Sequence, residues 1–234
     1  MRTGSAIIVA MLVGLTSMSC SDRDPEPAPS PVTTAAPAAT PGTQAPASGS
    51  LATAAAAAEA CGFTSASTAG PYYVSGTRAL TDGNLNYDDL DGTPIRIAGY
   101  VYGAADNSAP VGGAKIEIWQ ADNAGRYHPQ GQGAVDDFSA DEISLRGSVT
   151  SDDNGFYSFT SILPSEYGGR VRHIHVRATA PGHRDLISQI IVAQPGDDIG
   201  PEDDSVSNNF HTCSVVDFAD LDGIRTAIFN FHIQ

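Results

Sequence analysis

The chain has 234 residues, of which 17% are charged, and its formal net charge at pH 7 is −15. Lys115 is its only lysine, and so acidic a protein is not expected to bind nucleic acid or anionic lipid through its charge. Any attachment to a membrane must therefore come from the N-terminus.

The N-terminus has the pattern of a secretory signal peptide. Arg2 precedes an apolar run from Ala6 to Leu15, which is too short to span a bilayer, and small residues follow it. We expect a signal peptide over residues 1–19. Cleavage before Cys20 resembles the processing of bacterial lipoproteins, so a cell-surface lipoprotein lipidated at Cys20 is expected, with ordinary secretion as the alternative. Both place the mature chain outside the cytoplasm.

Residues 20–60 read as a lipid-anchor cysteine followed by a disordered tether. From Asp24 onward the segment is dominated by Ala, Pro, Thr and Ser, so it has too little apolar surface to offset the entropy of ordering. Ala54 to Ala58 could form a turn of helix, but so short a helix is marginal in water. Residues 61–234 have the size of one domain.

The remaining cysteines, Cys61 and Cys213, lie near the two ends of this domain. In an oxidising compartment an even pair favours a disulfide, and two unpaired buried thiols are the alternative. A metal site built on cysteine is not expected, because the sequence has no Cys-X-X-Cys or Cys-X-His spacing.

Short segments of alternating apolar and polar residues recur in the domain and predict β-strands. Turn-forming residues such as Asp153-Asn154-Gly155 and Pro181-Gly182 separate them. The fold class is therefore all-β, an antiparallel β-sandwich with long active-site loops at 128–145 and 195–209, the second of them acidic and solvated. The expected strands are Ile95–Tyr102, Ala114–Trp119, Phe156–Ser161, His173–Thr179, Leu186–Val192, Ser214–Phe218 and Ala227–Ile233.

His173 and His175 point to one face of their strand, because alternate residues of a strand share a face. This arrangement suits metal binding, although a solvated pair of histidines has the same pattern. Gly168 and Gly169 permit a tight turn that would bring Tyr167 back toward the imidazoles, but a loop tyrosine packing its ring is the plainer interpretation of Tyr167 alone. Keeping a phenol ionised at neutral pH costs roughly 4 kcal/mol, which a highly charged cation can supply.

Five separated elements of this chain together resemble the intradiol ring-cleavage dioxygenases, the family of catechol and protocatechuate 3,4-dioxygenases. The resemblance covers about residues 68 to 192, and its elements follow one another in the family order. They are Gly70-Pro71-Tyr72-Tyr73, Trp119-Gln120 to Gly125-Arg126-Tyr127, Arg146-Gly147 with the turn Asp153 to Gly155, Tyr167 with Arg170 and His173-Ile174-His175, and Gln189.

The resemblance implies a non-haem Fe(III) centre held by Tyr127, Tyr167, His173 and His175 with a solvent hydroxide. It further implies that a catechol-type aromatic diol displaces Tyr167, that Tyr167 and the hydroxide take the substrate protons, and that O2 cleaves the ring to a cis,cis-muconate type product. By the same resemblance Arg170 stabilises charge that builds on the ring, while Gln189 and Tyr72 line the substrate pocket. Gln189 could instead be an exposed polar residue of its strand.

Four other histidines could compete for the metal: His128, His183, His211 and His232. His128 adjoins Tyr127 and its side chain should diverge from it, and His232 alternates with Phe229 and Phe231 as a strand-face residue. The resemblance favours the set given above.

The chain lacks the helical dimerisation segment of the best-known cytoplasmic members of the family, and it also lacks their insertion before the first histidine, so it resembles a smaller secreted or surface-anchored branch. Substrate identity and oligomeric state are not carried over. The alternative function is a surface-tethered, transthyretin-like or carbohydrate-binding β-sandwich without catalysis. A zinc or copper hydrolytic site is disfavoured, because the motif contains no third histidine and no carboxylate.

Overall fold

The computed structural model describes residues 48–194, 196–205 and 213–234, so the expected signal peptide, Cys20 and His211 lie outside the described residues. No helix of the described part is both long and apolar enough to cross a membrane. Its elements are α1 (Ser48–Ala57), β1 (Val74–Ser75), β2 (Pro94–Tyr102), β3 (Lys115–Gln120), β4 (Gly133–Ala134), β5 (Arg146–Thr150), β6 (Phe156–Ile162), β7 (His173–Thr179), β8 (Leu186–Val192), β9 (Val215–Val216), β10 (Ala219–Leu221), β11 (Ile224–Ile228) and β12 (Phe231–His232), with four short 3-10 turns.

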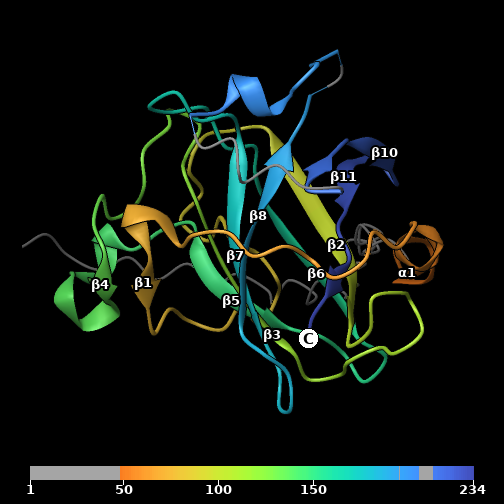
Figure 1. Cartoon of the computed structure of the whole chain (residues 1–234). Helices are drawn as coiled ribbons and strands as arrows, with labels where there is room; N and C mark the ends of the chain where they lie inside the picture. The colour runs from red at the N-terminus through yellow and green to blue at the C-terminus, as the bar shows by residue number, and fades with distance from the viewer. Residues whose placement is uncertain (1–47, 195, 206–212) are drawn as a thin grey trace, which may run out of the picture. The chain divides into compact units, whose positions relative to one another are not determined.

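Two five-stranded sheets form the β-sandwich that the sequence predicts (Figure 1). One sheet has the order β5-β3-β7-β8-β9. In the other sheet β2 is central: it pairs with β6 along one side and with β11 and β12 along the other, and β10 pairs with β11. The long pairings, β3 with β5 and β7, β7 with β8 and β2 with β6, are antiparallel. Short parallel pairings, such as β8 with β9, extend the sheets at their edges.

Alternation along the strands separates the core from the face that carries polar residues. Ile174 and Val176 of β7 join Ile116 and Ile118 of β3 in one buried cluster, to which β2 and β6 of the other sheet contribute Ile97 and Phe159. His173 and His175, on the same strand as Ile174, belong to the opposite face. The first sheet is thus apolar toward the second sheet and carries its chemistry on its outer face.

Four observed strands, β1, β4, β5 and β10, were not predicted, and the expected strand Ser214–Phe218 is shortened to β9. β5 was not predicted, because Arg146 and Gly147 are poor strand formers, and only the pairing with β3 defines it. The expected strand Ala227–Ile233 is divided into β11 and β12. Asn230 lies at the break, and its side chain, in place of a backbone carbonyl, accepts a hydrogen bond from the Tyr100 amide at 2.8 Å.

Residues 48–57, which the sequence assigns to the disordered tether, form α1 instead. Alanine has the highest helix propensity, and Leu51 and Ala55, one turn apart, are both buried, with α1 in contact with β2. The Asn230 side chain also donates to the carbonyl of Ala55 at 2.9 Å. Packing against the domain therefore stabilises a helix that would be marginal in isolation.

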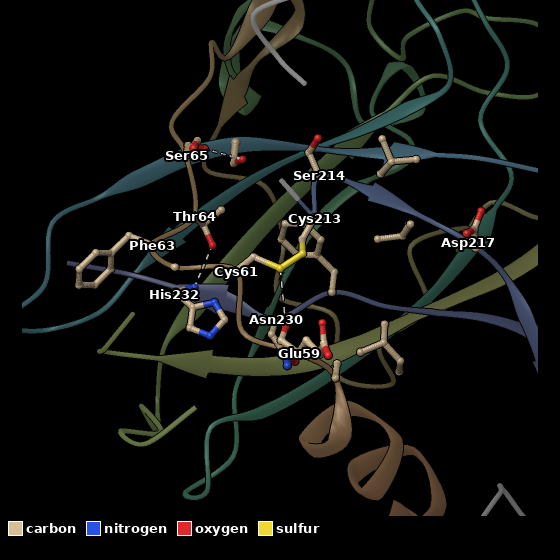
Figure 2. A pocket seen from close by; sticks show the side chains of 17 residues that line it. Glu59, Cys61, Phe63, Thr64, Ser65, Cys213, Ser214, Asp217, Asn230 and His232 are labelled. Carbon is tan, nitrogen blue, oxygen red and sulfur yellow. Dashed lines mark hydrogen bonds between the residues drawn. A yellow bond between two sulfur atoms is a disulfide. The ribbon is translucent and has the colours of Figure 1, made fainter. Parts of the chain in front are cut away.

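Cys61 and Cys213 form a disulfide with a Cα–Cα distance of 6.2 Å (Figure 2). It joins the segment after α1 to the segment that leads into β9. A cavity of 250 Å³ lies beside it, lined among others by Phe63, His232 and Asn230, and none of the predicted iron ligands borders this cavity.

We expect Cys61→Ser/Cys213→Ser to lower the free energy of unfolding substantially. The bridge closes a loop of 152 residues, and the chain-entropy model assigns such a loop about 5 kcal/mol. Chemical denaturation of the parent and the double variant measures the difference. A thiol count on the unfolded, unreduced protein provides the control, because free thiols from both cysteines would contradict the bridge.

Candidate active site

One row of four residues crosses the outer face of the first sheet. Arg146 of β5 pairs with Trp119 of β3, Trp119 pairs with His175 of β7, and His175 pairs with Gln189 of β8. Residues directly opposite one another in a sheet point to the same face, so four residues that are distant in sequence become neighbours. All four are almost completely buried under the loops that cover this face.

The two histidines of β7 are held with their Nε2 atoms facing each other at 3.2 Å. His173 Nδ1 lies 2.7 Å from the Val171 carbonyl, to which it donates, so the lone pair is on Nε2. The ring of His175 stacks on Trp119 with centroids 5.1 Å apart and planes 5° apart. Gly70 lies against the same ring, where a Cβ atom would be 3.2 Å from His175 Cε1.

Tyr127 reaches the histidines from a tight loop after β3. Asp122 organises this loop: its Oδ1 accepts hydrogen bonds from the amides of Ala124 and Arg126, and its Oδ2 lies 2.9 Å from His128 Nε2. Gly125 adopts φ +75°, and a Cβ there would be only 2.6 Å from the Glu166 carbonyl oxygen. A glycine is therefore required where the Tyr127 loop touches the segment that carries Tyr167.

Tyr167 and Arg170 close the turn that the glycine pair predicts. The Arg170 amide donates to the Tyr167 carbonyl at 2.8 Å, and the Tyr167 amide donates to the Arg170 carbonyl at 3.3 Å. Gly168 and Gly169 both have positive φ, 53° and 74°. This hairpin of residues 167–170 directs the phenol back toward His173, so of the two possibilities left open for Tyr167 the structure shows the folded-back one.

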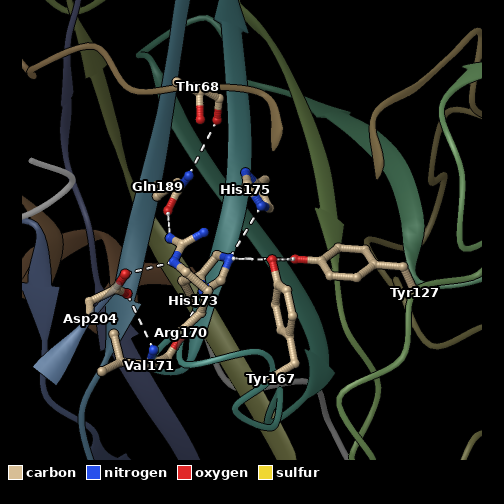
Figure 3. A network of polar contacts seen from close by, with 9 residues as sticks. All are labelled: Thr68, Tyr127, Tyr167, Arg170, Val171, His173, His175, Gln189 and Asp204. Atoms are coloured by element: carbon tan, nitrogen blue, oxygen red, sulfur yellow. Dashed lines mark hydrogen bonds and ion pairs between the residues drawn. The ribbon is translucent and has the colours of Figure 1, made fainter. Parts of the chain in front are cut away.

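Four potential ligand atoms converge at one point (Figure 3). The two tyrosine hydroxyls are 3.3 Å apart, and His173 Nε2 lies 3.2 Å from the Tyr167 hydroxyl and 3.5 Å from the Tyr127 hydroxyl. Donors at about 2.0–2.2 Å from a single ion lie roughly 3 to 3.5 Å from one another, so this set has the spacing of a metal site. Two phenol oxygens with two imidazole nitrogens suit a hard, highly charged cation.

Burial keeps all four groups neutral in the absence of a cation. It lowers the pKa of His173 to about 4 and the pKa of His175 well below the usual value, with the nearby Arg170 charge acting in the same direction. Burial also raises the pKa of Tyr127 and, less strongly, that of Tyr167, which Arg170 partly offsets. The imidazoles thus offer lone pairs at neutral pH, while the phenols require a cation to ionise.

Arg170 and Gln189 lie beside these four groups and contact each other. Arg170 Nη2 donates to Gln189 Oε1 at 2.6 Å, and Gln189 Nε2 donates to the Thr68 carbonyl at 3.3 Å. Gln189 is only 1% exposed, so the alternative of a solvated strand residue is wrong. Arg170 Nε donates to Asp204 at 2.7 Å, a partner that sequence reasoning missed.

Tyr72 packs directly on the candidate ligands. Its ring stacks on that of Tyr127 with centroids 4.4 Å apart and meets Tyr167 edge-on at 6.1 Å. The indole nitrogen of Trp119 donates to the Ala69 carbonyl at 3.3 Å, which holds this segment over the sheet. Tyr72 therefore packs against both candidate tyrosine ligands, and its contact with a substrate stays a prediction.

The competing histidines that the structure describes have other surroundings. His128 pairs with Asp122, and His232 is buried in β12, stacked on Tyr102 with its Nε2 3.0 Å from Asn107. His183 lies in the turn between β7 and β8. Among the described residues no group of three or more His, Cys, Asp or Glu side chains could hold a metal, so the mixed tyrosine and histidine set is the candidate centre.

Arg146 is a second residue whose role the sequence did not indicate. Its fully buried guanidinium donates to the carbonyls of Tyr72, His128 and Pro129, and it lies 5.8 Å from the centroid of the Tyr127 ring. Burial lowers its pKa to about 10, so it is charged at neutral pH. Arg146 thereby ties the Tyr72 segment to the Tyr127 loop.

We expect Arg146→Met to destabilise the protein by roughly 2 to 4 kcal/mol. The variant leaves three carbonyls without their donor, each at a cost of about 1 to 3 kcal/mol, while removal of a buried charge recovers part of that loss. Denaturant unfolding measures the change. Arg184→Met, at an exposed arginine, is the matched control, and equal stabilities of the two variants would contradict the assigned role.

A family model described as Dioxygenase matches residues 68–220, which include every residue of the site. The chain belongs to the intradiol dioxygenase family. Catechol 1,2-dioxygenase from Candida albicans is 30% identical over 156 residues, 58% of this chain and 49% of that protein. Hydroxyquinol 1,2-dioxygenase from Nocardioides simplex is 30% identical over 147 residues, 55% of this chain and 47% of that protein. This family member spans about half the length of the curated relatives it matches.

Solved structures of the family share the fold. The dioxygenase domain of a dioxygenase and carbohydrate-binding protein fusion from Streptomyces sp. SirexAA-E is 26% identical with a TM-score of 0.57, and the match covers 73% of this chain and 97% of that one. Catechol 1,2-dioxygenase from an Acinetobacter species is 27% identical with a TM-score of 0.59, covering 74% and 63%. The β-sandwich is thus the fold of the intradiol dioxygenases.

Proposed function

We propose that this member of the family is an Fe(III)-dependent intradiol dioxygenase. It would cleave the ring of a catechol-type aromatic diol between the two hydroxylated carbons, adding both atoms of O2 to give a cis,cis-muconate type diacid. The observation that carries the proposal is the convergence of the hydroxyls of Tyr127 and Tyr167 with Nε2 of His173 and His175.

Tyr127, Tyr167, His173 and His175 would hold the iron. Fe(III) would supply the charge that ionises both phenols and binds and activates the diol for reaction with O2. Hard anionic donors favour the ferric state, and the neutral imidazoles complete the set without excess negative charge.

The tyrosines would act differently during turnover. Tyr127 is almost fully buried, stacks on the Tyr72 ring and lies near the Arg146 guanidinium. It would remain a ligand. Tyr167 is partly exposed on a hairpin and would leave as the diol binds, with its phenolate oxygen accepting a substrate proton. Tyr72 would support the ring of the substrate.

Arg170 would place a permanent positive charge beside the substrate ring while negative charge builds on it. Gln189 would help to orient Arg170, which it contacts at 2.6 Å. Three further arginines form ion pairs with carboxylates: Arg126 with Asp122, Arg172 with Glu166 and Arg177 with Asp185. They offer little attraction for an anionic ring substituent, which favours uncharged catechols.

We further propose that the protein works outside the cytoplasm, as a bacterial surface lipoprotein anchored at Cys20 or as a secreted protein. The apolar N-terminal run and the Cys61–Cys213 bridge support this location, because disulfides persist in oxidising compartments. Mass spectrometry of the mature N-terminus tests it, and a chain that retains Met1 in its native host would contradict it.

Purified protein reconstituted with ferric iron tests the catalytic proposal. One iron per chain, a red to burgundy colour from phenolate-to-iron charge transfer, and O2 uptake are expected. Catechol, hydroxyquinol, protocatechuate and a caffeate-like catechol form the substrate panel. A colourless protein that stays inert after reconstitution would overturn the proposal in favour of a non-catalytic binding module.

A further inference from the structure

Asp204 differs from its acidic neighbours in the same segment because its side chain is buried. Its neighbours Glu202 and Asp203 are exposed, as the expectation of a solvated acidic loop requires, but the Asp204 side chain is completely buried. A buried carboxylate is stable only when it is paired or hydrogen-bonded, so this one must have partners inside the protein.

Two partners of Asp204 lie at the end of the hairpin that carries Tyr167. Oδ1 accepts from Arg170 Nε at 2.7 Å, and Oδ2 accepts from the Val171 amide at 3.2 Å. The next residue, Ser205, donates its amide to the Gly169 carbonyl at 2.8 Å. The Asp204 side chain and the Ser205 backbone therefore hydrogen-bond both to the hairpin backbone and to the Arg170 side chain.

Two of the three nitrogens of Arg170 are thereby occupied. Asp204 accepts a hydrogen bond from Nε and Gln189 accepts one from Nη2, and Gln189 in turn donates to the Thr68 carbonyl. Because the guanidinium is planar and rigid, two fixed nitrogens define the orientation of the third. Figure 3 shows the remaining nitrogen, Nη1, on the side of His173 and His175. Among the residues that the structure describes, Nη1 has no hydrogen-bond partner.

We propose that Asp204 is a positioning residue for ring cleavage, holding Arg170 so that Nη1 faces the bound diol. The inference rests on the proposed function. Asp204 would thereby contribute to the rate, because displacement of a catalytic group such as Arg170 by about 1 Å can cost 100-fold in rate. Asp204 itself need not contact the substrate or the iron.

Asp204→Asn removes the charge but keeps the size of the side chain. We expect it to lower kcat by about 10- to 100-fold with little change in KM, because Arg170 acts on charge that develops only in the transition state. Iron content and the visible band should stay within error of the parent. Asp204→Glu, which retains a carboxylate, should recover part of the lost rate.

Asp198→Asn is the matched control, since Asp198 is exposed in the same segment and the change in net charge is identical. A double-mutant cycle sharpens the test: in an Arg170→Gln background, Asp204→Asn should have almost no further effect on kcat, because the group it positions is already gone. Hydrogen exchange of the peptide amides at 169–172 should accelerate in Asp204→Asn irrespective of turnover.

The outcomes separate the two proposals. If the parent cleaves a catechol and Asp204→Asn matches Asp198→Asn, or if the effects of Asp204→Asn and Arg170→Gln multiply independently, the positioning role is overturned and the proposed function stands. If the iron-loaded parent cleaves none of the four catechols, both are overturned.

Discussion

Replacement of His175 by alanine is expected to abolish iron binding and with it ring cleavage. His175 is fully buried, stacks on Trp119 and lies against Gly70. The described histidines His128 and His232 have other partners, so neither imidazole is placed to replace it. Loss of a residue that only supports a metal ligand typically costs 10- to 100-fold in affinity or activity. Loss of the ligand itself should therefore lower activity by more than about 100-fold.

Iron content per chain, measured after ferric reconstitution and desalting, checks this result alongside O2 uptake. His183→Ala is the control, because His183 lies in the β7–β8 turn beyond the opposite end of the strand from His173. It should bind one iron and keep its colour. Retention of stoichiometric iron by His175→Ala would show that the assigned ligand set is wrong.

Tyr167→Phe should produce the second largest effect, and one of a different kind. Tyr127, His173 and His175 remain, so we expect iron to bind, with its visible band bleached or shifted because one of two phenolates is missing. Turnover should fall by roughly 100-fold or more, since the variant also lacks the oxygen that accepts a substrate proton, and general bases typically contribute 10²- to 10⁴-fold.

Visible spectra of the reconstituted protein and steady-state O2 uptake measure the two parts of this prediction. Tyr100→Phe is a suitable control, because the ring contacts of Tyr100 with Tyr102 and Phe156 do not depend on its hydroxyl. A Tyr167→Phe variant with the spectrum and the rate of the parent would remove Tyr167 from the ligand set.

The roles of the two tyrosines follow from their surroundings. Both hydroxyls reach the same point, 3.3 Å apart, but Tyr127 is 2% exposed and stacked under Tyr72, whereas Tyr167 stands on a partly exposed hairpin. A ligand that must leave and return needs room to move. The hairpin is also where Asp204 and Ser205 attach the acidic segment, so the same contacts bear on Arg170 and on the mobility of Tyr167.

Several parts of the site were predictable from the sequence because they depend on local rules. Alternation along 173–179 determines that His173 and His175 share a face, and the glycine pair at 168–169 determines that the chain turns between Tyr167 and Arg170. The order of these elements with Tyr127 and Gln189 indicated the family, which the family model confirms.

Features that depend on contacts between distant segments were seen only in the folded chain. Strand register aligned Arg146, Trp119, His175 and Gln189, burial turned one aspartate of an acidic loop into a partner of Arg170, and packing ordered α1. Which side chains each strand or turn presents could be predicted from the residues alone, because backbone geometry fixes their direction. Their partners could not be predicted in this way, because the pairing of strands and the packing of loops over them depend on contacts between residues that are far apart in the sequence.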